Sequence, residues 1–185
     1  LAHAALADPK RGRLRHDERA ARTALGIAGS REGRTDVWVD DWKLVLDGDA
    51  YHARIVARDF SLDLHFDATG RPLLQGEQGF SRKGNGRGEA SYYYSRPQLA
   101  VRGEVNGQSA TGLAWLDHEW SSQYMAANAA GWDWCGLNLD DGSALMAFRM
   151  RGKEGGVAYA PAGVAFEPQR QWKSPRTGTS YPVSM

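Results

Sequence analysis

The chain is poor in several features that would point to a particular class of protein. It has one cysteine, Cys135, so no disulfide can form within it. No apolar run approaches the 18 or so residues of a membrane-spanning helix, and no basic-then-apolar signal segment opens the sequence. The 23 Lys and Arg nearly balance the 22 Asp and Glu, and a net charge of +1 gives little attraction for nucleic acid or an anionic membrane. We therefore expect a small-molecule partner bound at a specific site, with no nucleic acid and no integral membrane segment in this chain.

Turn-forming and aromatic residues are plentiful, with 22 Gly, 7 Pro, 7 Trp and 7 Tyr. This usage predicts many short strands joined by tight turns. In residues 60–66, FSLDLHF, apolar residues alternate with Ser61, Asp63 and His65, which is typical of a strand with one buried face. The pair Asn106-Gly107 predicts a two-residue hairpin turn. Only residues 10–28 have a helical composition, and there we expect at most a short helix or a loop.

Strands follow one another without intervening helices, which favours an all-β fold with antiparallel strands that close into a barrel or fold over. From about Pro161 the strand pattern breaks and prolines accumulate. We therefore expect a first domain in residues 1–160. Residues 161–185 would form a linker and the first part of a second domain.

Residues 113–137 hold the densest group of side chains capable of chemistry, LAWLDHEWSSQYMAANAAGWDWCGL. In a regular strand His118 and Trp120 share one face, whereas Asp117 and Glu119 share the other. Trp132 and Trp134 likewise share a face that Asp133 opposes. Two such strands could present His118 and three indoles to one apolar space suited to a lipophilic ligand. In the alternative interpretation, the indoles are core residues and Asp117, His118 and Glu119 form a structural hydrogen-bond cluster.

Other kinds of site find less support. His52, His65 and His118 could contribute to a metal site, but no two histidines have i, i+2 or HExxH spacing. No GxSxG nucleophile motif occurs. We expect no metal and no cofactor, because protonation and water attack need only an acid, a base and a shaped cavity.

Four segments make the sequence resemble a known family: YYYSRPQLAVRGEV, GLAWLDHEWSSQ, GWDWCGLNLDDGSALMAFRMR and WKSPRTGTSYPV. They are similar to AttH-like proteins, often labelled predicted secreted hydrolases, which are related to carotenoid 1,2-hydratase (hydroxyneurosporene synthase). The resemblance implies a bacterial protein with a lipocalin-like fold of two β-barrel halves. This chain would be a fragment that covers most of the first half. It also implies a periplasmic or secreted location.

In the carotenoid hydratases the His and Trp of a DHxW run are implicated in the active centre, and here they match His118 and Trp120. Those enzymes also use a Tyr and an Asp from the following strands, and the Asp protonates an isoprenoid double bond. The corresponding region here, SALMAFRMR, does not hold that pair.

The sequence thus leads to two functional hypotheses. The first is a hydratase-like or hydrolase-like enzyme that acts on a hydrophobic substrate, such as an isoprenoid, by acid–base chemistry in an apolar barrel pocket. His118 would mediate proton transfer, and Asp117 or Glu119 would orient it or act as the acid. The residues expected to surround the substrate are Trp120, Tyr124, Trp132, Asp133 and Trp134. The alternative is a lipocalin-type binding protein that holds a lipophilic molecule without transforming it.

Overall fold

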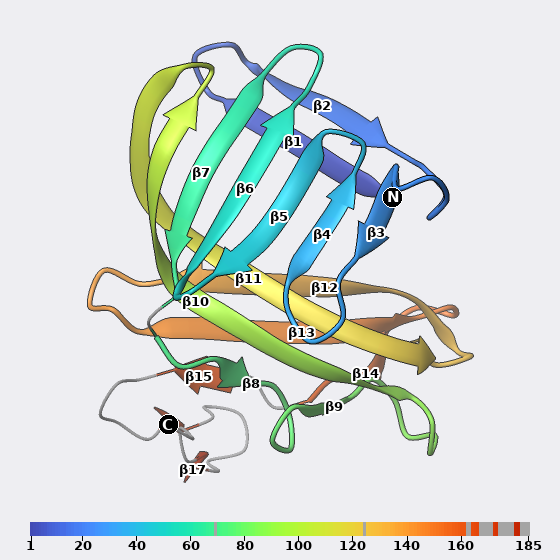
Figure 1. Ribbon diagram of the computed structural model, residues 1–185. Helices are drawn as coiled ribbons and strands as arrows, with labels where there is room; N and C mark the ends of the chain where they lie inside the picture. Colours follow the sequence, from blue (N-terminus) through green and yellow to red (C-terminus); the bar gives the residue numbers. More distant parts are fainter. Residues whose placement is uncertain (69, 124, 162–163, 167–171, 174–179, 182–185) are drawn as a thin grey trace. The chain divides into compact units, whose positions relative to one another are not determined.

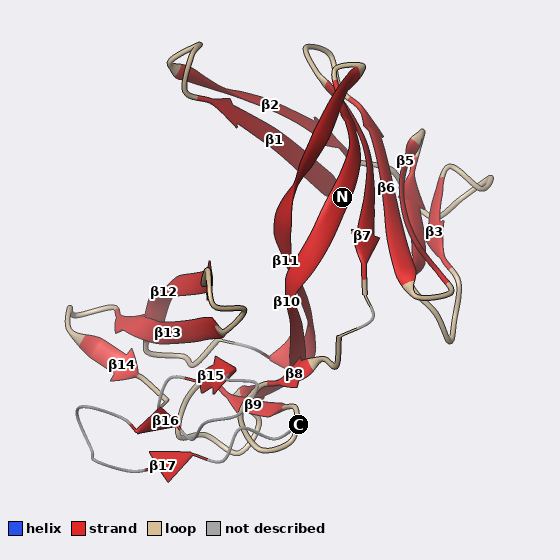
Figure 2. Ribbon diagram, turned by 90° about the vertical axis from the view of Figure 1, so that its left-hand side faces the viewer, coloured by secondary structure: helices blue, strands red, loops and turns tan. Residues whose placement is uncertain are grey.

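The computed structural model describes residues 1–185 except 69, 124, 162–163, 167–171, 174–179 and 182–185 (Figure 1). Every regular element in the described part of the chain is a β-strand, and the paired strands are antiparallel (Figure 2). These residues contain no helix long and apolar enough to cross a membrane. The expected all-β antiparallel class is confirmed, but the described strands form open sheets and not a closed barrel.

The chain divides into two compact units. The first comprises Leu1–Thr69 with Ala100–Leu113, and the second comprises Gly70–Leu99 with Ala114–Met185. Two 16-residue strands, β10 (Ala90–Val105) and β11 (Gln108–Gln123), contribute residues to both units. Asn106 and Gly107 join them with positive φ angles of 56° and 71°, which confirms the predicted two-residue turn.

The first unit consists of one hairpin and a meander. Its strands are β1 (Ala2–Asp8), β2 (Arg13–Arg19), β3 (Ala28–Ser30), β4 (Asp36–Val39), β5 (Trp42–Asp47), β6 (Ala50–Val56) and β7 (Ser61–Asp67). β1 pairs with β2, the strands β3 to β7 pair in succession, and β7 also pairs with β10. Ala4, Trp42 and Phe60 form a buried apolar cluster, so this cluster joins the hairpin to the meander.

The expectation of a helix or loop at residues 10–28 is wrong for Arg13–Arg19, which is strand β2. The buried side chains of β2 are both charged, namely those of Arg15 and Asp17. Asp17 accepts hydrogen bonds from the backbone N–H of Arg58 and from Arg19, and Arg15 donates to the carbonyl of Asp59. Because the buried face of β2 is ionic, apolar periodicity does not reveal the strand.

The second unit adds further strands to the other half of the β10–β11 hairpin. They are β8 (Leu73–Leu74), β9 (Phe80–Arg82), β12 (Ala129–Asn138), β13 (Ala144–Gly152), β14 (Val157–Tyr159), β15 (Val164–Phe166), β16 (Trp172–Lys173) and β17 (Ser180–Tyr181). β8 and β9 pair with β10, whereas β12, β13 and β14 form a separate sheet in which β15 also pairs with β13. A buried apolar cluster of the second unit consists of Ala126, Ala129 and Met150.

Gln98 in β10 connects these two sheets of the second unit. It has a positive φ of 56°. Its backbone N–H donates to Asn138 Oδ1 at 2.9 Å, and its amide donates to the carbonyls of Leu139 at 2.9 Å and Ser143 at 2.6 Å. The turn between β12 and β13 is thereby attached to β10.

The domain boundary expected near Pro161 stays a prediction, because most of residues 161–185 lie outside the described part of the chain.

Candidate active site

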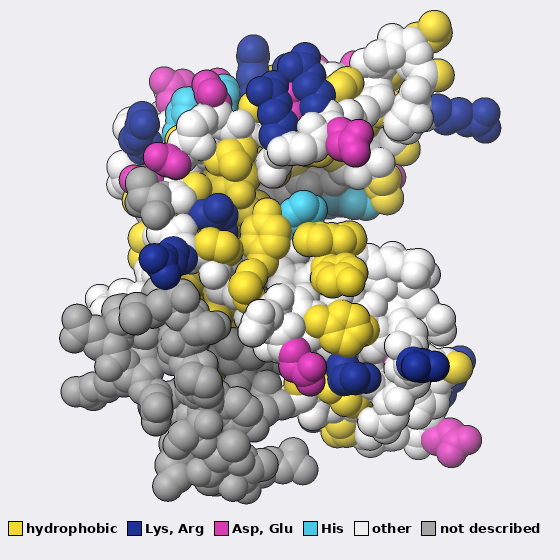
Figure 3. All heavy atoms as spheres, turned by 60° about the horizontal axis from the view of Figure 1, so that its bottom comes forward, with side chains coloured by type: hydrophobic (Ala, Val, Ile, Leu, Met, Phe, Trp, Pro, Cys, Tyr) yellow, Lys and Arg dark blue, Asp and Glu magenta, His cyan; other side chains and the backbone are white. Residues whose placement is uncertain are grey.

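A pocket of about 460 Å³ lies within the second unit. Its walls are largely aromatic or apolar, and they enclose one lysine and one carboxylate. The lining residues are Lys83, Tyr93, Glu119, Trp120, Ser121, Trp132, Trp134, Phe148 and Met150. On the face of the molecule shown in Figure 3, hydrophobic side chains likewise reach the surface beside acidic and basic ones. A concave site with apolar walls and a few polar groups suits a small hydrophobic ligand.

Strand alternation in β10 decides which of its side chains face this pocket. Ser91, Tyr93 and Ser95 are buried, whereas Tyr92 is exposed on the other face. Glu119 of β11 lies on the same face as Ser91, because its Oε1 accepts a hydrogen bond from Ser91 Oγ at 2.5 Å. The face of the β10–β11 hairpin that carries Tyr93 therefore also carries the polar side chains of Ser91, Ser95 and Glu119.

Lys83 and Glu119 are the charged groups of the pocket. Lys83 Nζ lies 2.7 Å from Glu119 Oε1 and 3.2 Å from Ser81 Oγ, to which it donates. The same nitrogen lies 4.7 Å from the centre of the Tyr93 ring and 4.1 Å from that of Phe148, close enough for cation–π attraction. Burial lowers the pKa of Lys83 below its usual 10.5, and the carboxylate of Glu119 opposes this shift.

The Tyr93 hydroxyl is the second polar group at the pocket wall. It accepts a hydrogen bond of 3.0 Å from Trp134 Nε1. Burial raises the pKa of this hydroxyl above its usual 10.0, and the negative charge of Asp117 and a hydrogen bond to that carboxylate add to the rise. Tyr93 therefore stays protonated over the ordinary pH range and can donate a hydrogen bond.

Asp117 accepts a hydrogen bond from Tyr93 but is not one of the residues that line the pocket. Its Oδ1 accepts hydrogen bonds from Ser95 Oγ at 2.6 Å and from Trp115 Nε1 at 2.8 Å. Ser95 accepts in turn from the buried amide of Gln75 at 2.8 Å. The position of the Asp117 carboxylate is thus fixed by a chain of side-chain hydrogen bonds.

His118 faces away from Asp117 and Glu119, as the alternation predicted. Its Nδ1 lies 3.0 Å from the hydroxyl of Tyr94, and its ring centre lies 4.9 Å from that of Trp120. Trp120 lines the pocket and His118 does not. The structure therefore brings Glu119 together with Trp120, Trp132 and Trp134, whereas His118 belongs to an adjacent aromatic group.

Asp133 and Tyr124 are the remaining two candidate residues. Asp133 is exposed and binds Arg149 Nε at 2.6 Å and Arg151 Nε at 3.4 Å, and it is not a lining residue. Tyr124 lies outside the described residues.

Sequence reasoning did not single out Lys83, Tyr93, Phe148 or Met150. Lys83 lies in the segment SRKGNGRGEA, whose glycines indicated only a flexible hairpin. A usable signal was the alternation in SYYYS, which predicts that the central tyrosine faces opposite to its neighbours. Among the residues that line the pocket in the described chain, Glu119 is the only metal-ligand type of His, Cys, Asp or Glu. The pocket itself therefore offers no metal-ligand set.

These features define a class: all-β proteins of antiparallel sheets with an aromatic pocket around a lysine–carboxylate pair. The chain belongs to the AttH-like family, whose model matches residues 1–185.

Comparison with solved structures agrees with this assignment. The chain is similar to a protein from Nitrosomonas europaea whose crystal structure is assigned as AttH, with 46% identity and a TM-score of 0.79 over 98% of this chain and 63% of that one. It also shares the fold of kievitone hydratase from Nectria haematococca, with 14% identity and a TM-score of 0.54 over 80% of this chain and 52% of that one. The chain thus spans less than two thirds of either protein. No curated protein matches it. The family resemblance and the lipocalin-like fold class are confirmed.

Proposed function

We propose that this chain provides the active site of a hydratase-like or hydrolase-like enzyme that acts on a hydrophobic small molecule. The observation that carries the proposal is the Lys83–Glu119 pair, which lies among indole and phenyl rings in a pocket large enough for such a molecule. A lipophilic substrate would be held by the apolar walls, and the pair would supply the chemistry.

Addition of water requires one group that gives a proton to the substrate and one that takes a proton from the attacking water. Glu119, as a carboxylate, can accept the proton of water. Lys83, as an ammonium whose pKa is lowered by burial, can donate a proton or a hydrogen bond to a substrate oxygen. Hydrolysis of an ester would use the same two groups, with water again activated by Glu119 and the carbonyl oxygen bound by Lys83.

Tyr93 and Asp117 have supporting roles in this proposal. The Tyr93 hydroxyl donates its proton to Asp117 and accepts from Trp134 Nε1, so the two residues hold one indole wall of the pocket in place. His118 contacts Tyr94 and Trp120, and in this proposal it positions one pocket wall. A structural neighbour named as a hydratase makes water addition the first reaction to test. A lipophilic substrate and a periplasmic or secreted location are further parts of the proposal.

The experiment uses the full-length protein with a panel of apolar alkenes, unsaturated ketones and esters in ¹⁸O-labelled water. Mass spectrometry should find the heavy oxygen in a product alcohol or acid. Glu119→Gln should abolish its formation and still bind ligand, as followed by quenching of tryptophan fluorescence. The exposed Asp133→Asn serves as the matched carboxylate control and should retain turnover.

The opposite result would favour the binding-protein hypothesis. If ligands bind, are recovered unchanged, and bind equally well to Glu119→Gln, then the pocket stores or carries its ligand and the enzymatic proposal is wrong.

A further inference from the structure

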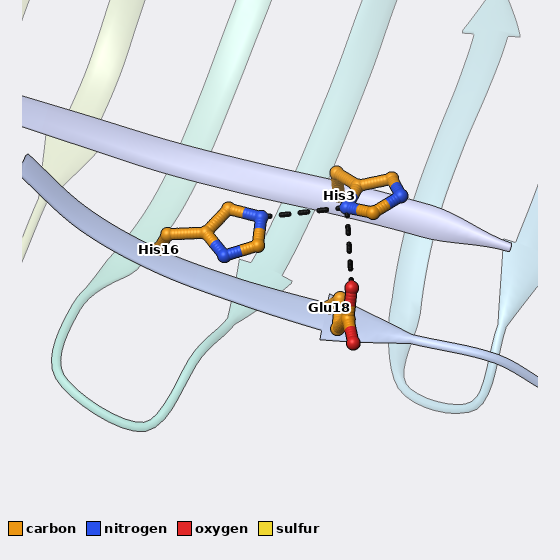
Figure 4. Close-up of side chains that lie close together, drawn as sticks. All are labelled: His3, His16 and Glu18. Carbon is orange, nitrogen blue, oxygen red and sulfur yellow. Dashed lines mark hydrogen bonds and ion pairs between the residues drawn. The ribbon is translucent and has the colours of Figure 1, made fainter.

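The outer face of the β1–β2 hairpin carries two histidines and a glutamate whose side chains converge (Figure 4). His3 Nδ1 lies 3.3 Å from His16 Nε2 and 3.5 Å from Glu18 Oε2. One ligand atom from each residue lies within 4.8 Å of the other two. All three residues are exposed and belong to the first unit, so this cluster is separate from the pocket around Lys83.

Strand register explains why these residues meet. His3 is directly opposite Glu18 in the antiparallel pair, and His16 is opposite Ala5, two residues further along β1. His16 and Glu18 are also two residues apart on β2, so all three side chains leave the same face of the hairpin. The sequence alone does not show this, because 13 residues separate the two histidines.

The opposite face of the hairpin holds the backbone in place. Ala4, Arg15 and Asp17 are buried there. Asp17 is anchored to the backbone N–H of Arg58, and Ala4 packs against Trp42 and Phe60. A ligand set on this hairpin is therefore built on a fixed backbone, and only its exposed side chains need to turn.

The distances fit one class of ion. A tetrahedral zinc site with Zn–N and Zn–O bonds of about 2.0–2.2 Å has edges of about 3.3–3.5 Å between its ligand atoms. Two of the three separations, 3.3 Å and 3.5 Å, have this size, and the third, between His16 and Glu18, is within 4.8 Å. Imidazole suits zinc, copper, iron and nickel, whereas calcium and magnesium prefer oxygen ligands.

A second His-containing cluster, formed by His52, Asp63 and His65 on β6 and β7, fits an ion less well. The rings of His52 and His65 are stacked with centres 4.2 Å apart and an interplanar angle of 0°. An ion bound by two imidazoles lies near the plane of each ring, and two parallel planes share no point. The rings of His3 and His16 are also stacked, but their centres are 5.6 Å apart and their planes are inclined by 21°, so the planes do intersect. His52 Nε2 is moreover engaged by Asp63 Oδ1 at 2.6 Å. This cluster is therefore a matched control for the first one.

We propose that His3, His16 and Glu18 bind a divalent transition-metal ion, with zinc as the expected occupant. Two imidazole nitrogens and one carboxylate oxygen supply three ligands, and the fourth position faces solvent, where a water molecule completes the coordination. This site would be an addition to the chemistry proposed for the pocket, and it does not depend on it.

The test is zinc binding by the untagged full-length protein after dialysis against a chelator. Isothermal titration with Zn²⁺ should show one site on this hairpin, and Co²⁺ in its place should give the visible absorption of tetrahedral cobalt. His16→Asn and Glu18→Gln should each weaken the affinity by about tenfold or more, since even loss of a group outside the ligand shell costs this much. His52→Asn should leave the affinity and the cobalt spectrum unchanged.

Two results would overturn the proposal. One is the absence of stoichiometric binding by the parent protein. The other is binding that survives both His16→Asn and Glu18→Gln in variants with a parent-like circular dichroism spectrum. Because the readout is metal affinity, the result is independent of whether the pocket is catalytic: Glu119→Gln should bind Zn²⁺ like the parent.

Discussion

Lys83 and Glu119 form an ion pair whose two partners differ sharply in their exposure to water. Their charged atoms are 2.7 Å apart, but 8% of the Lys83 side chain is exposed, against 37% of the Glu119 side chain. The ammonium therefore depends on the carboxylate for most of its charge compensation, whereas the carboxylate can still be solvated. Replacing one partner should not have the same effect as replacing the other.

Glu119→Gln should destabilise the second unit more than Lys83→Met does. The first change leaves a buried ammonium without its counter-ion, and the second removes the charge and keeps an apolar stem. We expect Glu119→Gln to lower the free energy of unfolding by about 1–3 kcal/mol, which is less than for a fully buried pair because Glu119 is partly exposed. Urea unfolding measures the difference. Lys153→Met, at an exposed lysine, is the control, and equal losses for Glu119→Gln and Lys83→Met would contradict the asymmetry.

Tyr93→Phe should remove a pH-dependent contribution to stability. The raised pKa of Tyr93 means that the folded state keeps this proton above pH 10.0, where an unfolded tyrosine loses it. The stabilising contribution is therefore complete below pH 10.0 and is lost as the pH rises through the folded-state pKa. At neutral pH the variant should lose about 1 kcal/mol with the hydrogen bond of the hydroxyl.

The measurement is urea unfolding at pH 8 and at pH 11 for the parent, Tyr93→Phe and Tyr92→Phe. The gap between parent and Tyr93→Phe should narrow at the higher pH. Tyr92, whose ring is on the exposed face of β10, should not reproduce this change. A gap that is the same at both pH values would show that the Tyr93 hydroxyl does not titrate as inferred.

Gly76→Ala should be among the more damaging glycine replacements. Gly76 has a φ of +66°, and an added Cβ would collide with the carbonyl oxygen of Phe80 and lie 2.9 Å from Ser81 Cα. These are backbone atoms of β9 itself, which is paired with β10, so they cannot move aside alone. The left-handed conformation by itself costs about 1–3 kcal/mol for a residue with a side chain.

Gly112→Ala is the matched control, because Gly112 has open space around the added Cβ and no φ in the left-handed region. Its unfolding midpoint should stay close to that of the parent. If Gly76→Ala were equally well tolerated, the turn before β9 would have to be able to rearrange without disturbing Lys83.

The alternation of apolar and polar residues was enough to predict the strands whose inner faces are apolar. Six of the seven residues of FSLDLHF lie in β7 (Ser61–Asp67), and the Asn106-Gly107 turn lies between β10 and β11. Strand β2 could not be found in this way, because Arg15 and Asp17 are its buried residues and their partners, Asp59 and Arg58, lie more than 40 positions away. Local periodicity carries no information about such distant partners.

For the site, alternation correctly separated His118 from Asp117 and Glu119 and placed Trp132 with Trp134. It could not show that Glu119 rather than His118 lines the pocket with these indoles, since that depends on which face of β11 meets β12. It also could not find Lys83, which reaches Glu119 from a glycine-rich segment 36 positions earlier in the sequence.

The hydrogen bonds of Gln98 also bear on how the second unit folds. They join residues 40, 41 and 45 positions apart, so the entropy of closing a long loop is lost before any of them can form. Contacts between such distant residues slow folding. Trp132 and Trp134 of β12, which are about half exposed in the folded unit, will therefore be fully exposed on a newly synthesised chain until β10 and the β12–β13 turn meet. During that interval, a chaperone that binds aromatic segments would compete with the rest of the chain for the future pocket wall.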